Sequence, residues 1–370
     1  MSILINASSF GARPSGARSR FENLHPLLFS AHKGSMFTLI VSKDYDLPPD
    51  VQALDNVRAI RLPFKSTDKL LRRLFFAALP LAALAIPKFD MIDDLSQPPT
   101  LLRSTRRLLT VHDIRRLDIS SSRISYYAYK LSLWFCRALG YRVITVSEAM
   151  AGQLSRHYPA SRIEVIQNSV PAAFLEHFSS VESIASDVCA APYILAVGHF
   201  ETRKNYARLV QAFAVLANDR PDLQLIIVGK DNGAEASIHK LVVQLGLGAR
   251  VHLHSNISDA HLFDLYRSAT ALTFPSLYEG FGIPLLEAMA MSCPLIISDI
   301  DVFREIAGEA ALYFDPQDVE AMCSAMDSLL ASEELRSELT EKGRKRLGKF
   351  RPGELAAKLG ALYSEQRLIG

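Results

Sequence analysis

The residues of this chain that could do chemistry gather in the stretch PSLYEGFGIPLLEAMA, residues 275–290. Gly280 and Gly282 have no Cβ, so the backbone there can turn sharply and approach a ligand closely. Pro284 suits the first turn of a helix, because the amide proton that proline lacks has no intrahelical partner there. We therefore expect a helix N-terminus whose amide groups and partial positive charge bind an anion, most naturally a phosphate.

Two carboxylates flank this turn, Glu279 before it and Glu287 inside the expected helix. A carboxylate repels a phosphate, but it accepts hydrogen bonds from sugar hydroxyls at several positions. The pattern therefore favours a ligand with hydroxyls on both sides of a phosphate, as in a nucleoside diphosphate sugar. A simpler alternative is that Glu287 only complements the helix dipole and Glu279 is solvated, but this alternative leaves both glycines unexplained.

Two adjacent cations, Arg203 and Lys204, follow the strand-like run YILAVG in the stretch HFETRKN. Arginine binds a diphosphate with a planar fork and lysine binds it as a point charge. Both would stabilise the negative charge that develops on a departing nucleoside diphosphate. Such a pair alone is usually part of a solvated surface. Its position directly after a strand is what favours a binding role.

Short runs rich in β-branched and apolar residues alternate with longer amphipathic stretches along the whole chain. The runs lie at 3–7, 37–42, 107–113, 142–147 and 163–168 in the first half, and at 193–198, 223–229, 250–255, 271–276 and 294–299 in the second. Strands that alternate with helices predict parallel sheets built from βαβ units. We therefore predict an α/β protein with two doubly wound, Rossmann-like domains, in which ligands bind beyond the carboxyl ends of the strands.

The length of 370 residues also favours two domains of about 150 to 200 residues each. We expect an N-terminal domain over 1–172 and a linker over 173–191. A C-terminal domain over 192–350 would follow, and a C-terminal helix over 351–370 would pack back toward the N-terminal domain. Two such domains imply a cleft, where we expect the chemistry.

The composition excludes several classes of protein. The chain is 49% hydrophobic and 22% charged, which excludes a disordered, collagen-like or coiled-coil protein. The net charge of +2 excludes the strongly basic charge balance that is typical of nucleic-acid-binding proteins. The start MSILINASSF lacks the features of a signal peptide. The four cysteines are far apart and form no CxxC, so we expect reduced thiols in a cytoplasmic protein, at Cys136, Cys189, Cys293 and Cys323.

The first half of the chain has two features that bear on membranes. Basic residues outnumber acidic ones between Lys65 and Arg142, which predicts a positive surface. The most apolar segment, LFFAALPLAALAIP at 74–87, is too short to span a bilayer and contains Pro80. It is either a core helix or a helix that lies on a membrane surface, and the second alternative would make the protein peripheral on the inner face of the membrane.

Taken together, these stretches resemble the retaining nucleotide-sugar glycosyltransferases of family 4, which have the GT-B fold. The resemblance rests first on the E-x7-E spacing from Glu279 to Glu287 and on VGHFETRKN, which is similar to an RKN-type, mannosyltransferase-like subgroup. Further matching stretches occur in the family's order, so nearly the whole chain is covered: HDI, TVSE, IEVIQNSV, SDAHLFDLYRSA and REIAGEAALYFDP.

The resemblance implies roles for the residues of the 275–290 stretch. Glu287 would hold the ribose hydroxyls, and Glu279 would hold the hydroxyls of the transferred sugar. The backbone amides of Gly280, Phe281 and Gly282 would contact the sugar and the phosphate.

It also implies roles elsewhere in the chain. Arg203 and Lys204 would bind the diphosphate. Gly16, in the loop SSFGARPSGARSRF, would lie close to the phosphates, and His112 would lie over the sugar near the reacting carbon. The catalytic set implied in this way is His112, Arg203, Lys204 and Glu279.

The chain departs from the family pattern at three places. His199 stands where many members have arginine, the usual P-N-G-V segment is Gln167–Val170, and Ser292 replaces a usual glycine. None of the three removes a charge that the chemistry needs. The short D-x-D patterns at 44–46 and 299–301 lie outside the family motifs, and we expect neither a metal nor another cofactor.

The predicted function is transfer of a hexose, with mannose favoured, from a nucleotide diphosphate sugar such as GDP-mannose to a glycan or lipid-linked acceptor. The setting would be bacterial-type surface polysaccharide assembly, such as lipopolysaccharide, and the anomeric configuration would be retained. Alternatives on the same fold are a nucleotide-sugar epimerase and a phosphorylase. A nicotinamide-dependent oxidoreductase would need G-x-G-x-x-G after a strand, and ILINASSFGARPSG does not fit that pattern.

Overall fold

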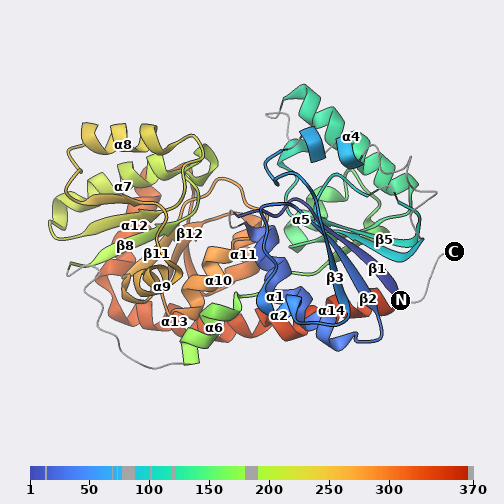
Figure 1. The fold of residues 1–370 in the computed structure, drawn as a ribbon. Coiled ribbons are helices and arrows are strands. Elements are labelled where there is room, and N and C mark those ends of the chain that lie inside the picture. The colour runs from blue at the N-terminus through green and yellow to red at the C-terminus, as the bar shows by residue number, and fades with distance from the viewer. Residues whose placement is uncertain are drawn as a thin grey trace. The chain divides into compact units, whose positions relative to one another are not determined.

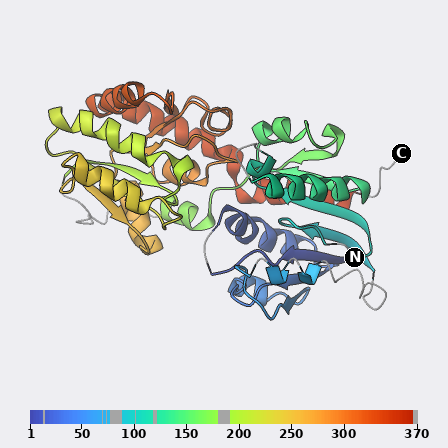
Figure 2. The ribbon, with the colours of Figure 1, turned by 90° about the horizontal axis from the view of Figure 1, so that it is seen from above.

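The computed structural model describes residues 1–12, 15–68, 70–72, 74–76, 88–100, 102–117, 122–179 and 191–365. The chain forms two compact units, one of Met1–Ser169 with Pro352–Gly370 and one of Val170–Arg351 (Figure 1). Each unit contains one sheet in which all the described strand pairs are parallel, with helices packed against it (Figures 1 and 2). The predicted fold class, an α/β protein with two parallel sheets, is confirmed.

The first unit is built on a seven-stranded sheet with the order β3-β2-β1-β4-β5-β6-β7. Its strands are β1 (Ser2–Ala7), β2 (Met36–Val41), β3 (Val57–Arg61), β4 (Phe89–Asp94), β5 (Ser104–Val111), β6 (Arg142–Thr145) and β7 (Ile163–Val165). Its described helices are α1 (Gly16–Ala31), α2 (Pro49–Gln52), α4 (Arg123–Ala138), α5 (Glu148–Leu154) and α14 (Pro352–Ser364), with short 3-10 turns η1 (Arg115–Leu117) and η2 (Ala160–Arg162).

Residues of β1 are buried on both faces of this sheet. Ile3 and Ile5 pack in a cluster with residues of α1 and α14, whereas Leu4 packs in a different cluster with Ile92. Burial on both faces explains why β1 is a continuous apolar run, as is typical of parallel sheets covered by helices. Helix α14, from the end of the chain, belongs to this unit and packs on α1, where Leu24 contacts Leu355 and Ala356.

The second unit is built on a six-stranded sheet with the order β10-β9-β8-β11-β12-β13. Its strands are β8 (Tyr193–Val197), β9 (Gln224–Val228), β10 (Val251–His254), β11 (Ala271–Phe274), β12 (Leu295–Ser298) and β13 (Ala311–Phe314). Its helices are α6 (Ala172–Ser179), α7 (Tyr206–Asp219), α8 (Glu235–Gln244), α9 (Asp259–Ser268), α10 (Ile283–Ala290), α11 (Asp301–Ala307), α12 (Val319–Ala331) and α13 (Glu333–Leu347), with 3-10 turns η3 (Thr202–Lys204) and η4 (Gly348–Phe350).

Some sequence predictions fall on residues outside the described ranges. They include residues 77–87 of the apolar 74–87 segment, residues 180–190 of the predicted linker, and Cys189. The other three cysteines are free thiols. Within the described ranges, no helix is long and apolar enough to cross a bilayer, and no cluster of three or more His, Cys, Asp or Glu side chains could hold a metal ion.

Candidate functional site

The second sheet changes its winding direction between β8 and β11. Strand β8 pairs with β9 on one side and with β11 on the other, so the connections leave this pair of strands in opposite directions. In open parallel sheets the crevice beyond the carboxyl ends of such a pair is the usual ligand site. Both predicted motifs lie at this edge, because HFETRKN follows β8 and PSLYEGFG follows β11.

Glu279 is the centre of an ion cluster at this edge. Its Oε1 lies 2.5 Å from Arg203 Nη1 and 2.7 Å from Lys204 Nζ, and the Ser276 hydroxyl donates to the same oxygen at 2.9 Å. Arg203 also forms an ion pair with Glu201 at 2.5 Å. The side chains of Lys204 and Glu279 are only 8% and 11% exposed. Solvent therefore screens these charges weakly, and three of the four predicted catalytic residues are in direct contact.

Burial and charge pairing act in opposite directions on the pKa values in this cluster. Burial alone would raise the pKa of Glu279, but the charges of Lys204 and Arg203 outweigh it and the pKa lies below its ordinary value. Burial lowers the pKa of Lys204 and the charge of Glu279 raises it, and with the nearby charge of Arg203 the pKa lies below its ordinary value. Glu279 is therefore ionised at neutral pH, and Lys204 holds its proton less firmly than an exposed lysine does.

Hydrogen bonds join the loop after β8 to the loop after β11. The Leu277 amide donates to the Arg203 carbonyl at 2.8 Å, and Arg203 Nη1 donates to the Tyr278 carbonyl at 3.0 Å. Asn205 ends η3 in the left-handed region at φ 60°, which asparagine tolerates better than most residues, and its side chain donates to the Pro316 carbonyl at 2.7 Å. These bonds fix the position of the cation pair relative to Glu279.

Gly198, which directly follows β8, makes room for Lys204. Its φ is 147°, and a Cβ at this position would lie 3.0 Å from Lys204 Nζ and 3.0 Å from the Tyr206 hydroxyl oxygen. Gly229, after β9, approaches still more closely, since its Cβ would lie 2.0 Å from the Gly198 carbonyl oxygen. The sequence indicates Gly198 only as the end of a strand, and the structure shows that it is needed for the packing of the site.

The predicted helix start in the 275–290 stretch is confirmed. Helix α10 begins at Ile283 with Pro284 in its first turn, and Gly282 precedes it at φ 123° and ψ 59°, a conformation that favours glycine. No side chain among the described residues caps this N-terminus. Gly280 is buried, and Phe281 is buried against the ring of Phe350 at 6.0 Å. Anion binding at this helix start remains a prediction.

Glu287 lies on α10, where it accepts a hydrogen bond from the buried Tyr266 hydroxyl of α9 at 2.7 Å. Burial raises the pKa of Glu287 to about 7, and the nearby charge of Asp259 acts in the same direction. The carboxyl group is therefore close to half ionised at neutral pH. The sequence does not single out Tyr266, although a buried tyrosine usually finds a hydrogen-bond partner.

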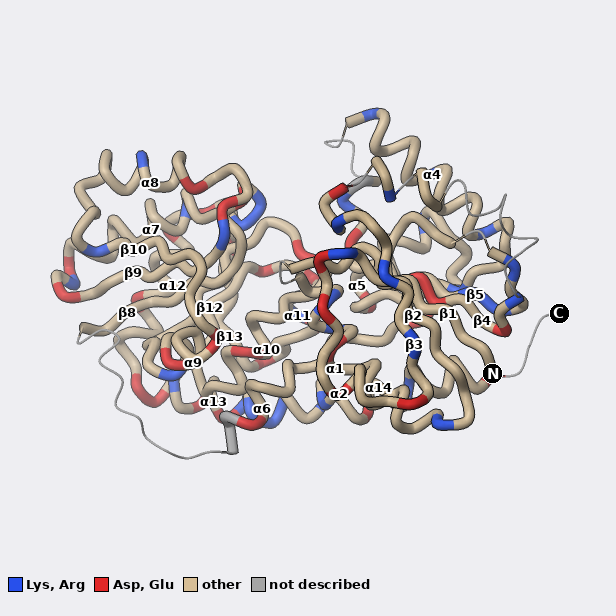
Figure 3. The backbone as a smooth tube through the Cα atoms, in the orientation of Figure 1, with Lys and Arg blue, Asp and Glu red and all other residues tan. Residues whose placement is uncertain are grey.

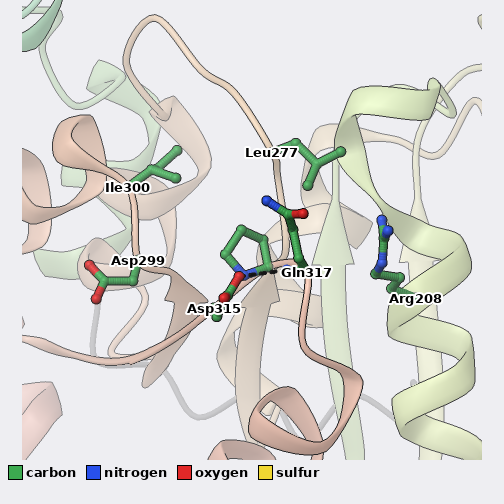
Figure 4. Close-up of a pocket in the computed structure, with 7 residues that line it drawn as sticks. Arg208, Leu277, Asp299, Ile300, Asp315 and Gln317 are labelled. Carbon is green, nitrogen blue, oxygen red and sulfur yellow. Dashed lines mark hydrogen bonds between the residues drawn. The ribbon is translucent and has the colours of Figure 1, made fainter.

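A cavity of about 610 Å³ opens beyond the carboxyl ends of β11, β12 and β13 (Figure 4). In Figure 4, Arg208 of α7 lies on one side of it and Asp299 and Ile300 on the other. Asp299 is paired with Arg304 at 2.7 Å. The volume is in the range of small-molecule pockets. The cavity could not be predicted from the sequence, because its lining comes from α7 and from separate loops, with Leu277, Asp315, Pro316 and Gln317 completing it.

His112 and Gly16 lie in the first unit. His112 directly follows β5, and its Nε2 lies 3.1 Å from the Leu95 carbonyl oxygen, so Nε2 carries the proton and donates it. Burial, and then the charge of Arg20, lowers the pKa of His112 to about 4, so the imidazole is neutral at neutral pH. Gly16 is the exposed first residue of α1, capped by the Ser15 hydroxyl, and its phosphate role remains a prediction.

Arg20 of α1 was not predicted. It is buried, and its Nη1 donates to the Gln167 carbonyl at 2.6 Å and to Asn168 Oδ1 at 3.2 Å. Its Nη2 has no hydrogen-bond partner within the described part of the chain. Burial lowers its pKa to about 10, so it stays charged. The sequence could not single it out, because several arginines stand in the loop SSFGARPSGARSRF and only the fold shows which of them is buried.

Comparison with known proteins bears on this site and on the fold. The model of "Glycosyltransferase Family 4" matches residues 31–174, and the model of "Glycosyl transferases group 1" matches residues 190–346. The chain therefore contains a glycosyltransferase family 4 domain followed by a glycosyl transferases group 1 domain. Both matches agree with the resemblance stated from the motifs, and the group 1 match contains the whole ion cluster.

Several curated relatives of this chain are mannosyltransferases. The O-antigen chain mannosyltransferase RfbU of Salmonella typhimurium is 34% identical over 62% of each chain. The serotype-specific mannosyltransferase WbdA of Escherichia coli is 37% identical over 44% of this chain and 20% of the relative. Each match therefore spans less than two thirds of the relative's length.

Solved structures show the GT-B fold. The lipopolysaccharide glycosyltransferase WaaG aligns over 99% of this chain and 100% of its own with a TM-score of 0.76 at 17% identity. Sucrose-phosphate synthase from Thermosynechococcus elongatus aligns over 98% of both chains with a TM-score of 0.73 at 22% identity. At these identities the likeness establishes the fold alone.

Proposed function

We propose that the protein is a retaining hexosyltransferase that transfers mannose from GDP-mannose to a glycan or lipid-linked acceptor during the assembly of a surface polysaccharide. The observation that carries this proposal is the ion cluster of Arg203, Lys204 and Glu279 at the switch between β8 and β11, together with the start of α10. The relatives that act on O-antigen chains support the choice of mannose and of a polysaccharide acceptor.

In this proposal the donor is bound by the second unit. Arg203, Lys204 and the amides at the start of α10 neutralise the diphosphate, so that no metal ion or other cofactor is needed. Glu279 accepts hydrogen bonds from the hydroxyls of the sugar, and Glu287, once ionised, accepts them from the ribose. Because Lys204 and Arg203 already keep Glu279 ionised, it is an acceptor throughout the neutral pH range.

The chemical step would be attack of an acceptor hydroxyl on the anomeric carbon from the face that the leaving group departs from. The C–O bond to the diphosphate breaks, the new glycosidic bond forms on the same face, and the diphosphate oxygen accepts the proton of the hydroxyl. The cation pair would stabilise the charge on the departing diphosphate. His112 and Gly16 keep the roles that the family resemblance implies, and the neutral His112 would serve as a hydrogen-bonding group.

A donor panel tests the proposal. Purified protein is incubated with mannose oligosaccharides or lipid-linked glycans and with GDP-mannose, GDP-fucose, UDP-glucose or UDP-N-acetylglucosamine in turn. Mass spectrometry of the acceptor should show one added hexose from GDP-mannose with equal release of GDP, and NMR should show the anomeric configuration of the donor in the product. Glu287→Gln should reduce turnover, whereas Glu309→Gln, on the exposed surface of the same unit, should not.

Two outcomes would contradict the proposal at different levels. Turnover of a UDP-sugar with none of GDP-mannose would refute the donor. An isomerised donor without any extended acceptor would refute transfer itself and indicate an epimerase.

A further inference from the structure

Helix α4 has an apolar face that is exposed in the described part of the chain. Its buried side consists of Tyr129, Leu133 and Cys136. At about 100° per residue, the large apolar residues on its solvent side fall within an arc about 100° wide that lies nearly opposite the buried side. These residues and their exposed fractions are Ile124 (84%), Tyr127 (66%), Leu131 (55%), Trp134 (60%) and Phe135 (41%), and we call them the α4 stripe.

A contiguous apolar stripe of this kind is unusual on a soluble surface. Isolated exposed apolar residues are ordinary, but contiguous apolar patches mark sites that bind a protein or a membrane. The α4 stripe combines aliphatic side chains with Trp134 and Tyr127. Tryptophan and tyrosine prefer the boundary between lipid headgroups and acyl chains, because one part of the ring system is apolar and the other is polar.

Positive charge runs along one flank of the α4 stripe. Arg123, Lys130 and Arg137 lie on α4 and are exposed, and no Asp or Glu occurs in the sequence from residue 123 to residue 147 (Figure 3). Arg162 adds to this charge at the end of the helix, where its Nη1 donates to the Arg137 carbonyl at 3.1 Å. A basic flank beside an apolar face complements a surface of anionic lipid phosphates above acyl chains.

The dimensions and charge of α4 also argue against a second copy of the chain as its partner. The helix has 16 residues and is about 24 Å long, so its apolar face covers about 250 Å², well below the roughly 800 Å² per partner of a stable interface. An antiparallel two-fold contact would also bring the two basic flanks close together. We propose that α4 docks on an anionic membrane surface. The α4 stripe would lie at the boundary between lipid headgroups and acyl chains, and the basic side chains would contact lipid phosphates.

This docking surface is distinct from the 74–87 segment considered from the sequence. It also goes beyond sugar transfer, because docking needs neither donor nor acceptor. Vesicle binding can therefore fail while sugar transfer succeeds, and sugar transfer can fail while vesicle binding succeeds. The two proposals are therefore tested separately.

Trp134 makes the test direct, since it is the only tryptophan of the chain. Vesicles of phosphatidylglycerol with phosphatidylcholine should shift its emission to shorter wavelength, protect it from iodide quenching and carry the protein in sedimentation. Vesicles of phosphatidylcholine alone should do so at least tenfold more weakly, and salt should weaken the anionic binding. The full chain is used throughout.

Two variants and a matched control sharpen the test. Ile124→Ser with Leu131→Ser removes apolar surface while it keeps Trp134 as the probe, and Lys130→Glu with Arg137→Glu reverses the flank. Each pair should lower the affinity for anionic vesicles about tenfold or more, with the circular dichroism unchanged because all four side chains are exposed. Val243→Ser, at a 61% exposed apolar position on α8, should leave the affinity unchanged.

Three results would overturn the proposal. The first is an emission that anionic vesicles leave unchanged. The second is equal vesicle binding by the stripe variant and by Val243→Ser. The third is emission that is already that of a buried indole without vesicles, which would show that the chain itself or, if it depends on concentration, a second copy covers the stripe.

Discussion

Replacing Glu279 by glutamine tests the ion cluster most directly, because the substitution keeps the shape of the side chain and removes only its charge. Arg203 retains Glu201 at 2.5 Å. Lys204 retains the ring of Phe274, whose centroid lies 4.4 Å from Nζ, but it loses the carboxylate 2.7 Å away and has a side chain only 8% exposed. Lys204 therefore becomes the poorly compensated charge.

The size of the effect follows from this burial. Removing one partner of a buried ion pair costs about 3–5 kcal/mol. The glutamine oxygen still accepts a hydrogen bond from Lys204, so we expect the lower end, about 3 kcal/mol of the free energy of unfolding of the second unit. Glu309→Gln is the control, because Glu309 is 90% exposed and lies 3.8 Å from Lys342, and it should leave the stability unchanged.

The assay must report on the second unit, and Trp134 lies in the first. Hydrogen exchange of peptides that cover β8 and β11, measured by mass spectrometry across a denaturant series, reports the opening free energy where the cluster lies. At neutral pH these peptides should exchange from the variant at lower denaturant than from the wild type or from Glu309→Gln.

The pH dependence gives a second, independent check. The folded-state pKa of Glu279 is depressed, so its stabilisation is present above the unfolded-state pKa of about 4.3 and is lost as the pH falls through the folded-state value. The difference between wild type and variant should therefore shrink in acid. The lowered pKa of Lys204 makes its buried charge costly, so the variant should recover stability as the pH rises toward about 10. A difference below about 1 kcal/mol at neutral pH, or one that shrinks neither in acid nor as the pH rises toward about 10, would refute the reasoning.

Three further predictions concern single residues. Because burial raises the pKa of Glu287 to about 7, calorimetric affinity for a nucleoside diphosphate sugar should rise between about pH 6 and about pH 8 and should lose this rise in Glu287→Gln; a flat wild-type profile would contradict this. Gly198→Ala places a Cβ 3.0 Å from Lys204 Nζ at φ 147° and should lower the free energy of unfolding by about 2 kcal/mol. The control Gly248→Ala, where the Cβ meets nothing within 4 Å, should leave that free energy unchanged. Equal effects of the two substitutions would count against the packing argument. Ser292→Gly should raise the free energy of unfolding by about 0.5 kcal/mol, because φ at this position is 59°, a conformation that glycine adopts more easily than serine. A denaturation midpoint below that of the wild type would contradict this.

The start of α10 shows what local sequence can predict. Gly282 and Pro284 suit the backbone conformation just before the helix and in its first turn. These residue types alone therefore indicated where the helix begins. The alternation of strands and helices was equally local, and it predicted both parallel sheets. Ser292 is the instructive exception: where the resemblance implies glycine, this chain has serine, and the serine adopts the left-handed conformation with φ 59°.

The partners within the site could not be predicted in the same way. The sequence predicts Glu279 as an acceptor for sugar hydroxyls and Arg203 and Lys204 as ligands of a diphosphate, but not that these side chains pair with each other. It also did not foresee Tyr266 as the donor to Glu287. These contacts join residues from different strands and helices, and only the order of the strands brings them together.

The amino-acid sequence by itself determined the two-sheet architecture, the glycine and proline turn before α10 and the charges available to the site, because each depends on residues close together in the chain. Tertiary structure alone decided that Glu287 titrates near neutrality, that Lys204 is buried beside Glu279, and which side of α4 faces solvent. Helix α4 has apolar residues on both sides, and its pattern does not distinguish the side that is buried. Burial is a property of distant contacts, and burial sets both the pKa values of the site and the surface left for a membrane.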